Sequence, residues 1–146
     1  MGEGAGTGQR AKGKGIGVGK NGFQDLTVWQ RARELAALVY QITMNASFSH
    51  DPSLRDQMRR AAVSIPSNIA EGDERETDKE AVRSFYIAKG SSAELHTQSL
   101  IAHDIGYIDD VQRERLTDSC SEISRMLANL IKARSRAPQT NPISTR

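Results

Sequence analysis

A helical periodicity runs through the segment Arg59-Arg60-Ala61-Ala62-Val63-Ser64-Ile65-Pro66-Ser67-Asn68-Ile69-Ala70-Glu71-Gly72, although it holds a proline, two serines and an asparagine, which are poor helix formers. Its apolar positions, with two that precede it, recur at steps of three and four: Leu54, Met58, Ala61, Ala62, Ile65 and Ile69. Asp51 and Pro52 suit the N-cap and the first helical position, and Gly72 suits the stop. Pro66 lies inside these limits and cannot donate to the carbonyl of Ala62, so we expect the helix to bend or open locally there.

Similar patterns before and after this segment predict further helices. A first helix is expected near residues 25–46, begun by Asp25 or Thr27, with Phe48 closing the end of the core. Its buried positions are Trp29, Ala32, Leu35, Ala36, Val39, Ile42, Thr43 and Ala46. A last helix, capped by Asp109 or Asp110 and fraying near Arg134, repeats a seam at Leu116, Cys120, Ile123, Leu127 and Leu130.

The helix expected between Thr77 or Asp78 and Gly106 is apolar on two sides. Its heptad seam comprises Ala81, Phe85, Ala88, Ser92, Leu95, Ser99 and Ala102. Nearly opposite lie Ile87, Glu94, Ile101 and Ile105. Four helices with short links and no candidate strand predict an all-α, antiparallel up-down-up-down four-helix bundle. Because such a small bundle covers only one face of each helix, we expect a second copy of the chain to cover the outer face of this one.

Composition divides the 146 residues into three parts. Residues 1–22 form a leader rich in glycine and lysine that we expect to be disordered, 23–134 form the bundle, and 135–146 form a flexible tail. The formal net charge is +2, but the leader and the tail are basic, so the bundle itself carries about −3. The single cysteine, the lack of a secretion signal and the lack of a long apolar run predict a cytoplasmic protein without a membrane anchor.

No constellation of residues indicates an enzyme. His50, His96 and His103 lack metal-ligand spacing, since a helical pair of ligands is usually four residues apart. Cys120 occupies a seam position and has no histidine placed to activate it. We therefore expect no catalytic residue, no cofactor, no metal and no small-molecule substrate.

Two sets of residues are candidates for interactions. The first set could form a subunit interface, or a polar network in which the buried carboxylate of Glu94 is paired or hydrogen-bonded. Its members are Arg59, Arg60, Val63, Ser64, Pro66, Asn68, Ile87, Glu94 and Ile101. The arginines among them also suit phosphate, but the acidic bundle favours assembly. For contacts with nucleic acid, the candidates are Lys12, Lys14, Lys20, Arg125, Lys132 and Arg134.

The chain resembles a known family over roughly residues 23–132. Its Phe23-Gln24-Asp25-Leu26-Thr27-Val28-Trp29-Gln30 segment, the serine-isoleucine-proline-serine-asparagine run at 64–68, the Ala88-Lys89-Gly90-Ser91-Ser92-Ala93-Glu94-Leu95 run and Gly106-Tyr107-Ile108 are similar to those of the four-helix-bundle proteins encoded by intervening sequences of bacterial 23S ribosomal RNA genes, also called S23 proteins.

The resemblance implies a homopentamer of antiparallel four-helix protomers. It also implies kinship to the Avd-like accessory proteins of diversity-generating retroelements, which bind a reverse transcriptase and nucleic acid. The sequence thus favours a non-enzymatic oligomeric bundle that acts as an accessory or scaffold protein associated with RNA or a reverse transcriptase. The alternative is a purely self-assembling protein with no role in nucleic-acid binding.

Overall fold

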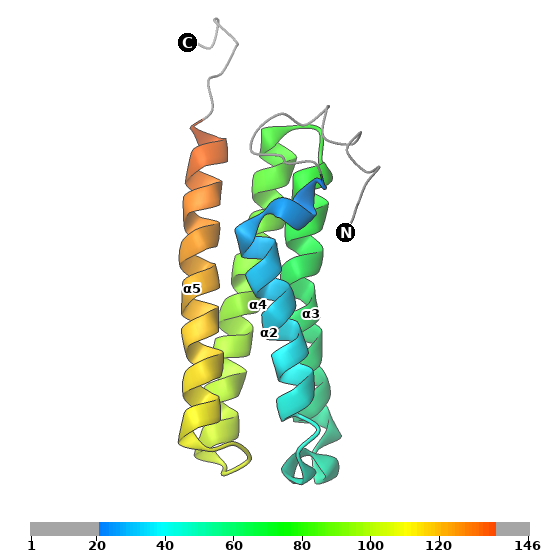
Figure 1. Ribbon diagram of the computed structural model, residues 1–146, viewed down its shortest axis with the longest axis vertical. Coiled ribbons are helices and arrows are strands. Elements are labelled where there is room, and N and C mark those ends of the chain that lie inside the picture. Colours follow the sequence, from blue (N-terminus) through cyan, green and yellow to red (C-terminus); the bar gives the residue numbers. More distant parts are fainter. Residues whose placement is uncertain (1–20, 137–146) are drawn as a thin grey trace, which may run out of the picture.

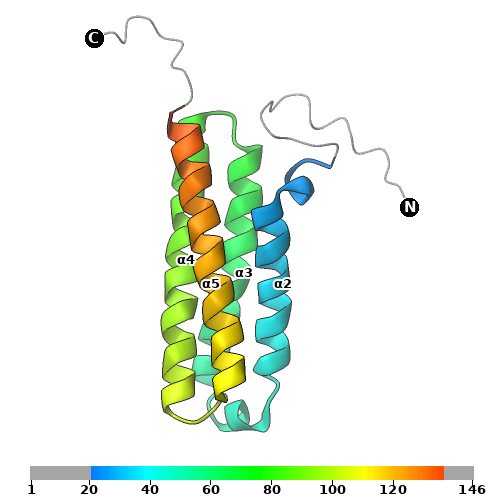
Figure 2. The same ribbon diagram turned by 60° about the vertical axis from the view of Figure 1, so that its left-hand side comes forward.

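Four long helices form the protein in the computed structural model, which describes residues 21–136 (Figure 1). In chain order the elements are a short 3-10 turn η2 (Phe23–Asp25), α2 (Thr27–Ile42), a second 3-10 turn η3 (Ala46–His50), α3 (Pro52–Glu74), α4 (Asp78–Asp104) and α5 (Asp110–Ser135). Successive helices run in opposite directions, and the two views agree on this arrangement (Figures 1 and 2). The prediction of an all-α, up-down-up-down four-helix bundle is therefore confirmed. Within the described residues, no helix is both long and apolar enough to cross a membrane.

The core follows the predicted seams closely. All seven seam residues of α4 are buried: Ala81, Phe85, Ala88, Ser92, Leu95, Ser99 and Ala102. On α5 the prediction holds as far as Leu127, but the next buried residue is Ile131, and Leu130 is only partly buried. A straight helix has 3.6 residues per turn, so a seam that repeats every 3.5 residues drifts away from the core near the end of a long helix.

The first helix is shorter than predicted, because the chain leaves it at Thr43. The Oγ1 of Thr43 donates to the carbonyl of Val39 at 2.7 Å, and the Oδ1 of Asn45 then caps η3 by accepting from the backbone N–H of Ser47 at 2.9 Å. Ala46, predicted to be buried, is therefore exposed in the turn. Phe48 is fully buried and closes this end of the core as expected.

Helix α3 begins as predicted and ends later. Asp51 is the N-cap, with its Oδ1 accepting from the backbone N–H of Leu54 at 3.1 Å, and Pro52 is the first residue. The helix continues through Pro66 without a break, so the local opening expected there does not occur. The predicted stop at Gly72 is also wrong, since the helix runs on to Glu74. Gly72 keeps a helical conformation, and it serves close packing instead: a Cβ there would lie 2.6 Å from the Cε1 of Phe85.

The end of α4 and the start of α5 follow the predicted signals. Gly106 has a φ of 83°, and Tyr107 and Gly106 donate their backbone N–H to the carbonyls of Ala102 and His103, which is a Schellman motif. Asp109 then caps α5 in a reciprocal capping box with Gln112. The hydroxyl of Tyr107 donates to the Oδ2 of Asp51 at 3.0 Å, so the two loops at this end of the bundle are tied together.

Candidate interaction surface

The outer face of α4 carries an apolar row interrupted by one carboxylate. Ile87, Ile101 and Ile105 are 49%, 45% and 50% exposed, and Glu94, midway between Ile87 and Ile101, is exposed as well. The spacing of seven residues places Ile87, Glu94 and Ile101 one above another on the helix. The protomer thus leaves uncovered the face that the sequence singles out as the second apolar side of this helix.

Helix α3 borders this row with one exposed apolar side chain and one arginine. Val63 is 43% exposed, and Arg60 is exposed beside it. Between the two helices lies an open groove of about 610 Å³, lined by Gln57, Arg60, Ala61, Val63, Ser64, Ser91 and Glu94. The structure therefore brings together Arg60, Val63, Ser64 and Glu94, four of the predicted interface residues.

The groove has a polar floor made by both helices. The hydroxyls of Ser64 and Ser91 are 2.8 Å apart, and the Nδ2 of Asn68 donates to the Oγ and the carbonyl of Ser64 at 3.0 and 2.9 Å. Ser64 and Asn68 thus join a polar network, and small hydroxyl side chains allow α3 and α4 to approach closely. Ser91 was missing from the predicted set, although its place in the Gly90-Ser91-Ser92 run of small residues could have indicated a close helix contact.

Glu94 was predicted to take part in a polar network, but it does not join the network of Ser64, Ser91 and Asn68. It is exposed to solvent, and its Oε2 accepts a long hydrogen bond of 3.5 Å from the Nε2 of Gln98. No ion pair joins it to Arg59 or Arg60 within the part of the chain that the structure describes. An exposed carboxylate is hydrated, so it requires no compensating partner inside the protomer.

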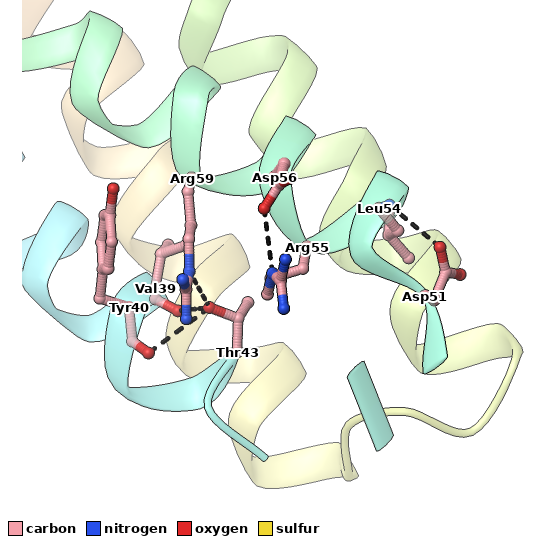
Figure 3. A network of polar contacts seen from close by, with 8 residues as sticks. All are labelled: Val39, Tyr40, Thr43, Asp51, Leu54, Arg55, Asp56 and Arg59. Atoms are coloured by element: carbon pink, nitrogen blue, oxygen red, sulfur yellow. Dashed lines mark hydrogen bonds and ion pairs between the residues drawn. The ribbon is translucent and has the colours of Figure 1, made fainter. Parts of the chain in front are cut away.

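Arg59, one of the candidates for the subunit interface or the polar network, lies against α2 (Figure 3). Its Nε donates to the Oγ1 of Thr43 at 2.8 Å, and its guanidinium lies over the ring of Tyr40, 4.5 Å from the centroid. Cation–π contact and a hydrogen bond to a buried hydroxyl hold the charge between the helices. Pro66 is half-buried on the same helix. The sequence signal missed here is the pair Tyr40 and Thr43, three residues apart near the end of the first helix.

Arg55, one turn before Arg59, pairs with its neighbour in sequence. Its Nε donates to the Oδ1 of Asp56 at 2.9 Å (Figure 3). This hydrogen bond from Arg55 holds the pKa of Asp56 below its usual value, with smaller contributions from the charges of Arg60 and Arg59. The carboxylate partly neutralises the run of arginines at the start of α3, which weakens that run as a phosphate site.

The candidates for nucleic-acid contact fall into three groups. Lys12, Lys14 and Lys20 lie outside the described residues. Arg125 and Lys132 are exposed on α5. Arg134 is engaged within the bundle: its Nε donates to the Oδ1 of Asp78 at 2.7 Å, its guanidinium lies 5.8 Å from the ring centroid of Phe85, and its side chain is only 16% exposed.

The remaining reactive side chains are placed for structure. Burial raises the pKa of the Cys120 thiol to about 12, so the thiol is protonated at neutral pH. The Nε2 of His103 lies 2.6 Å from the Oδ1 of Asp110, which joins the end of α4 to the start of α5. Within residues 21–136, no cluster of three histidine, cysteine, aspartate or glutamate residues is close enough to hold a metal ion.

Comparisons with known proteins agree with this architecture. A protein of unknown function from the S23 ribosomal protein family of Bacteroides thetaiotaomicron VPI-5482 has the same fold, with a TM-score of 0.66 and 20% sequence identity over 73% of this chain and 99% of that one. No curated protein matches the chain. The family model described as "23S rRNA-intervening sequence protein" matches residues 24–129, which is most of the bundle. The chain therefore belongs to the 23S rRNA-intervening sequence protein family.

Proposed function

We propose that this protein is a non-enzymatic, self-assembling helical bundle that acts as an accessory or scaffold protein associated with RNA or a reverse transcriptase. The observation that carries the assembly is the uncovered row of Ile87, Ile101 and Ile105 on α4, next to Val63 on α3. Full burial of an isoleucine stabilises by roughly 1.5–3 kcal/mol, so covering this row would contribute substantially to association.

The charges on the same surface favour a second copy of the chain as the partner. Arg60 and Glu94 line the same groove without an ion pair between them, so each is available to an oppositely charged residue of a neighbouring copy. Arginine beside apolar side chains is typical of interface cores. The family resemblance makes a ring of five copies the assembly that we propose.

Two observations support a role without catalysis. The only cysteine is buried and its raised pKa disfavours the thiolate that a nucleophile needs. The groove between α3 and α4 is open to solvent, in contrast to the enclosed, mostly apolar pockets in which enzymes bind small molecules.

Light scattering at micromolar concentration tests the assembly. We expect the native protein to be oligomeric and Ile101→Asp to dissociate it, because a carboxylate would be buried without a partner in the interface. Val111→Asp is the matched control: Val111 is 65% exposed in the first turn of α5, where an added acid suits the helix N-terminus. A monomeric native protein, or equal behaviour of the two variants, would contradict the proposed interface.

Binding to RNA at low salt tests the second part of the proposal. Phosphate contacts weaken steeply as salt rises, so we expect an affinity for RNA that falls with salt concentration. Deleting residues 1–22 measures what the leader adds. If the assembled protein binds no RNA even at low salt, with or without those residues, the alternative of a pure self-assembling protein is correct.

A further inference from the structure

One surface of the bundle, away from the apolar row, is strongly basic. Helix α4 has no acidic residue between Ala81 and Ala93, and α5 has none between Ile123 and Ser135. These stretches lie side by side at the end of the bundle where α4 begins and α5 ends, as both views show (Figures 1 and 2). Two contacts show which residues of the two helices lie opposite each other. Arg134 forms an ion pair with Asp78, and the Oγ of Ser92 donates a hydrogen bond to the carbonyl of Cys120.

The cations of this surface form two stripes. On α4, Lys79, Val82, Tyr86 and Lys89 follow one another at steps of three and four, and on α5 Arg125, Lys132 and Arg136 follow at steps of seven and four. We call Lys79, Tyr86, Lys89, Arg125, Lys132 and Arg136 the basic face. Both stripes extend over about 15 Å, from a rise of 1.5 Å per residue.

The acidic residues near this face do not neutralise most of its positive charge. Asp78 is occupied by Arg134. Glu80 lies four residues before Ser84 and eleven before Ser91, which contacts Ser64 of α3, so it belongs to the other side of α4. Among the described residues, no ion pair involves Lys79, Lys89, Arg125, Lys132 or Arg136. Clustered like charges on one face attract a polyanion.

An exposed aromatic ring within the stripe on α4 favours a single-stranded nucleic acid as the polyanion. Tyr86 is 59% exposed and lies between Lys79 and Lys89. At the end of the stripe, a hollow of about 350 Å³ is lined by Asp78, Lys79, Val82, Arg134 and Ser135. Surfaces that bind single strands combine cations along the backbone with aromatic rings on which unpaired bases stack. An acidic protein would use the cations but would gain little from an exposed ring among them.

We propose that the basic face is a binding site for single-stranded RNA, with the cations on the phosphates and Tyr86 stacked on a base. This inference rests on the RNA association proposed above and assigns it to α4 and α5. It leaves the apolar row on the α3 side of α4 free for assembly, so both partners fit the same protomer.

The test measures binding of a short labelled single-stranded RNA of mixed sequence to the full chain across a range of salt concentrations. Arg125→Gln with Lys132→Gln should weaken binding and reduce the slope of log affinity against log salt by about 1 to 2, because two phosphate contacts are lost. Arg33→Gln with Arg115→Gln removes the same charge from exposed positions outside the face and should leave the slope nearly unchanged.

Tyr86 provides a second measurement that does not depend on charge. Tyr86→Ala should weaken binding on the order of tenfold with an unchanged salt slope, and Tyr86→Phe should restore it, since the ring stacks without its hydroxyl. Light scattering and circular dichroism check that each variant is assembled and folded.

Four results would overturn the inference. If the native protein binds no RNA at low salt, the proposed RNA association fails together with the site. If it binds but the Arg125/Lys132 variant matches the Arg33/Arg115 control, RNA association stands and the site lies elsewhere. If polyglutamate competes as well as RNA at equal charge concentration, or Tyr86→Ala has no effect, the face is a general anion surface and not a site for single strands.

Discussion

At the scale of single residues, Gly72 allows α3 to pack closely against Phe85 of α4 because glycine has no Cβ. A Cβ at this position would lie 2.6 Å from the Cε1 and 2.9 Å from the Cδ1 of Phe85. Phe85 is fully buried, so its ring has little room to move. The glycine is therefore needed for the packing of α3 against α4, and its tendency to end helices is overridden by that packing.

Gly72→Ala should destabilise the protein by about 1–3 kcal/mol, because overpacking outweighs the better helix propensity of alanine. Gly90→Ala is the matched control: a Cβ there meets nothing within 4 Å, so alanine should stabilise α4 by about 0.5–1 kcal/mol. Thermal or denaturant unfolding at one protein concentration measures both. Equal effects of the two changes would show that Phe85 moves aside without cost.

Tyr107 gives a prediction about pH. Its hydroxyl donates to the Oδ2 of Asp51, and this hydrogen bond is the main reason that its pKa is raised above 10.0. Because the folded protein favours the protonated phenol, the stabilisation is complete below pH 10 and is lost as the pH rises through the folded pKa.

Tyr107→Phe should therefore lower the unfolding midpoint at neutral pH, and the difference from the native protein should shrink above about pH 10. The phenylalanine keeps the edge-to-face contact with Phe48, whose ring centroid lies 5.1 Å away. Comparing the two proteins removes every effect of pH that they share. A difference that stays constant across this pH range would assign the effect to packing instead.

At the scale of elements, α3 keeps a proline inside an unbroken helix of 23 residues. The carbonyl of Ala62 cannot receive its usual backbone donor from Pro66. Neighbouring contacts hold the segment: Ile65 and Ile69 are fully buried, and Asn68 donates to Ser64. Tertiary packing thus outweighs the local preference, which is why the opening predicted from sequence is absent.

Pro66→Ala should stabilise the protomer by about 2 kcal/mol. A proline in a helix interior costs about 3 kcal/mol relative to alanine, and up to about 1 kcal/mol of that is offset by its stiffening of the unfolded chain. Ser67→Ala, at the adjacent exposed position, is the control and should gain only a few tenths of a kcal/mol. A loss of stability in Pro66→Ala would mean that the half-buried ring contributes more packing than the missing hydrogen bond costs.

Helix α4 was the element best predicted from sequence. Its cap at Thr77, its seam and its stop at Gly106 are all found where their patterns indicate. Each depends on local geometry or on helical periodicity, which hardly change with the surroundings. The ends of α2 and α3 were less accurate, because Thr43, Asn45 and Gly72 act through contacts that no local pattern contains.

At the scale of the whole molecule, the proposed assembly links stability to concentration. Anything that binds the folded state stabilises it by mass action, so the unfolding midpoint of an oligomer rises with protein concentration. We expect this rise for the native protein and for Val111→Asp, and a midpoint independent of concentration for Ile101→Asp. Scanning calorimetry over a hundredfold range of concentration measures it; a native midpoint that does not move would contradict assembly.

The candidate surface was predicted only in part. Periodicity identified Ile87, Glu94 and Ile101 as a face outside the core, because residues seven apart share a side of any helix. It did not show that Arg59 lies over Tyr40 or that Arg134 pairs with Asp78, since those partners come from other helices. The basic face was missed for the same reason: Lys79, Tyr86 and Lys89 join Arg125 and Lys132 only when α4 and α5 lie side by side.

The sequence by itself determined that four amphipathic helices form, which residues face the core and where most helices begin, because periodicity and capping are local properties of the chain. The tertiary structure decided which charges are paired and which remain exposed, why Gly72 continues a helix and how two basic stripes become one surface. These outcomes depend on side chains far apart in sequence, and their free energies arise only when the helices are in contact.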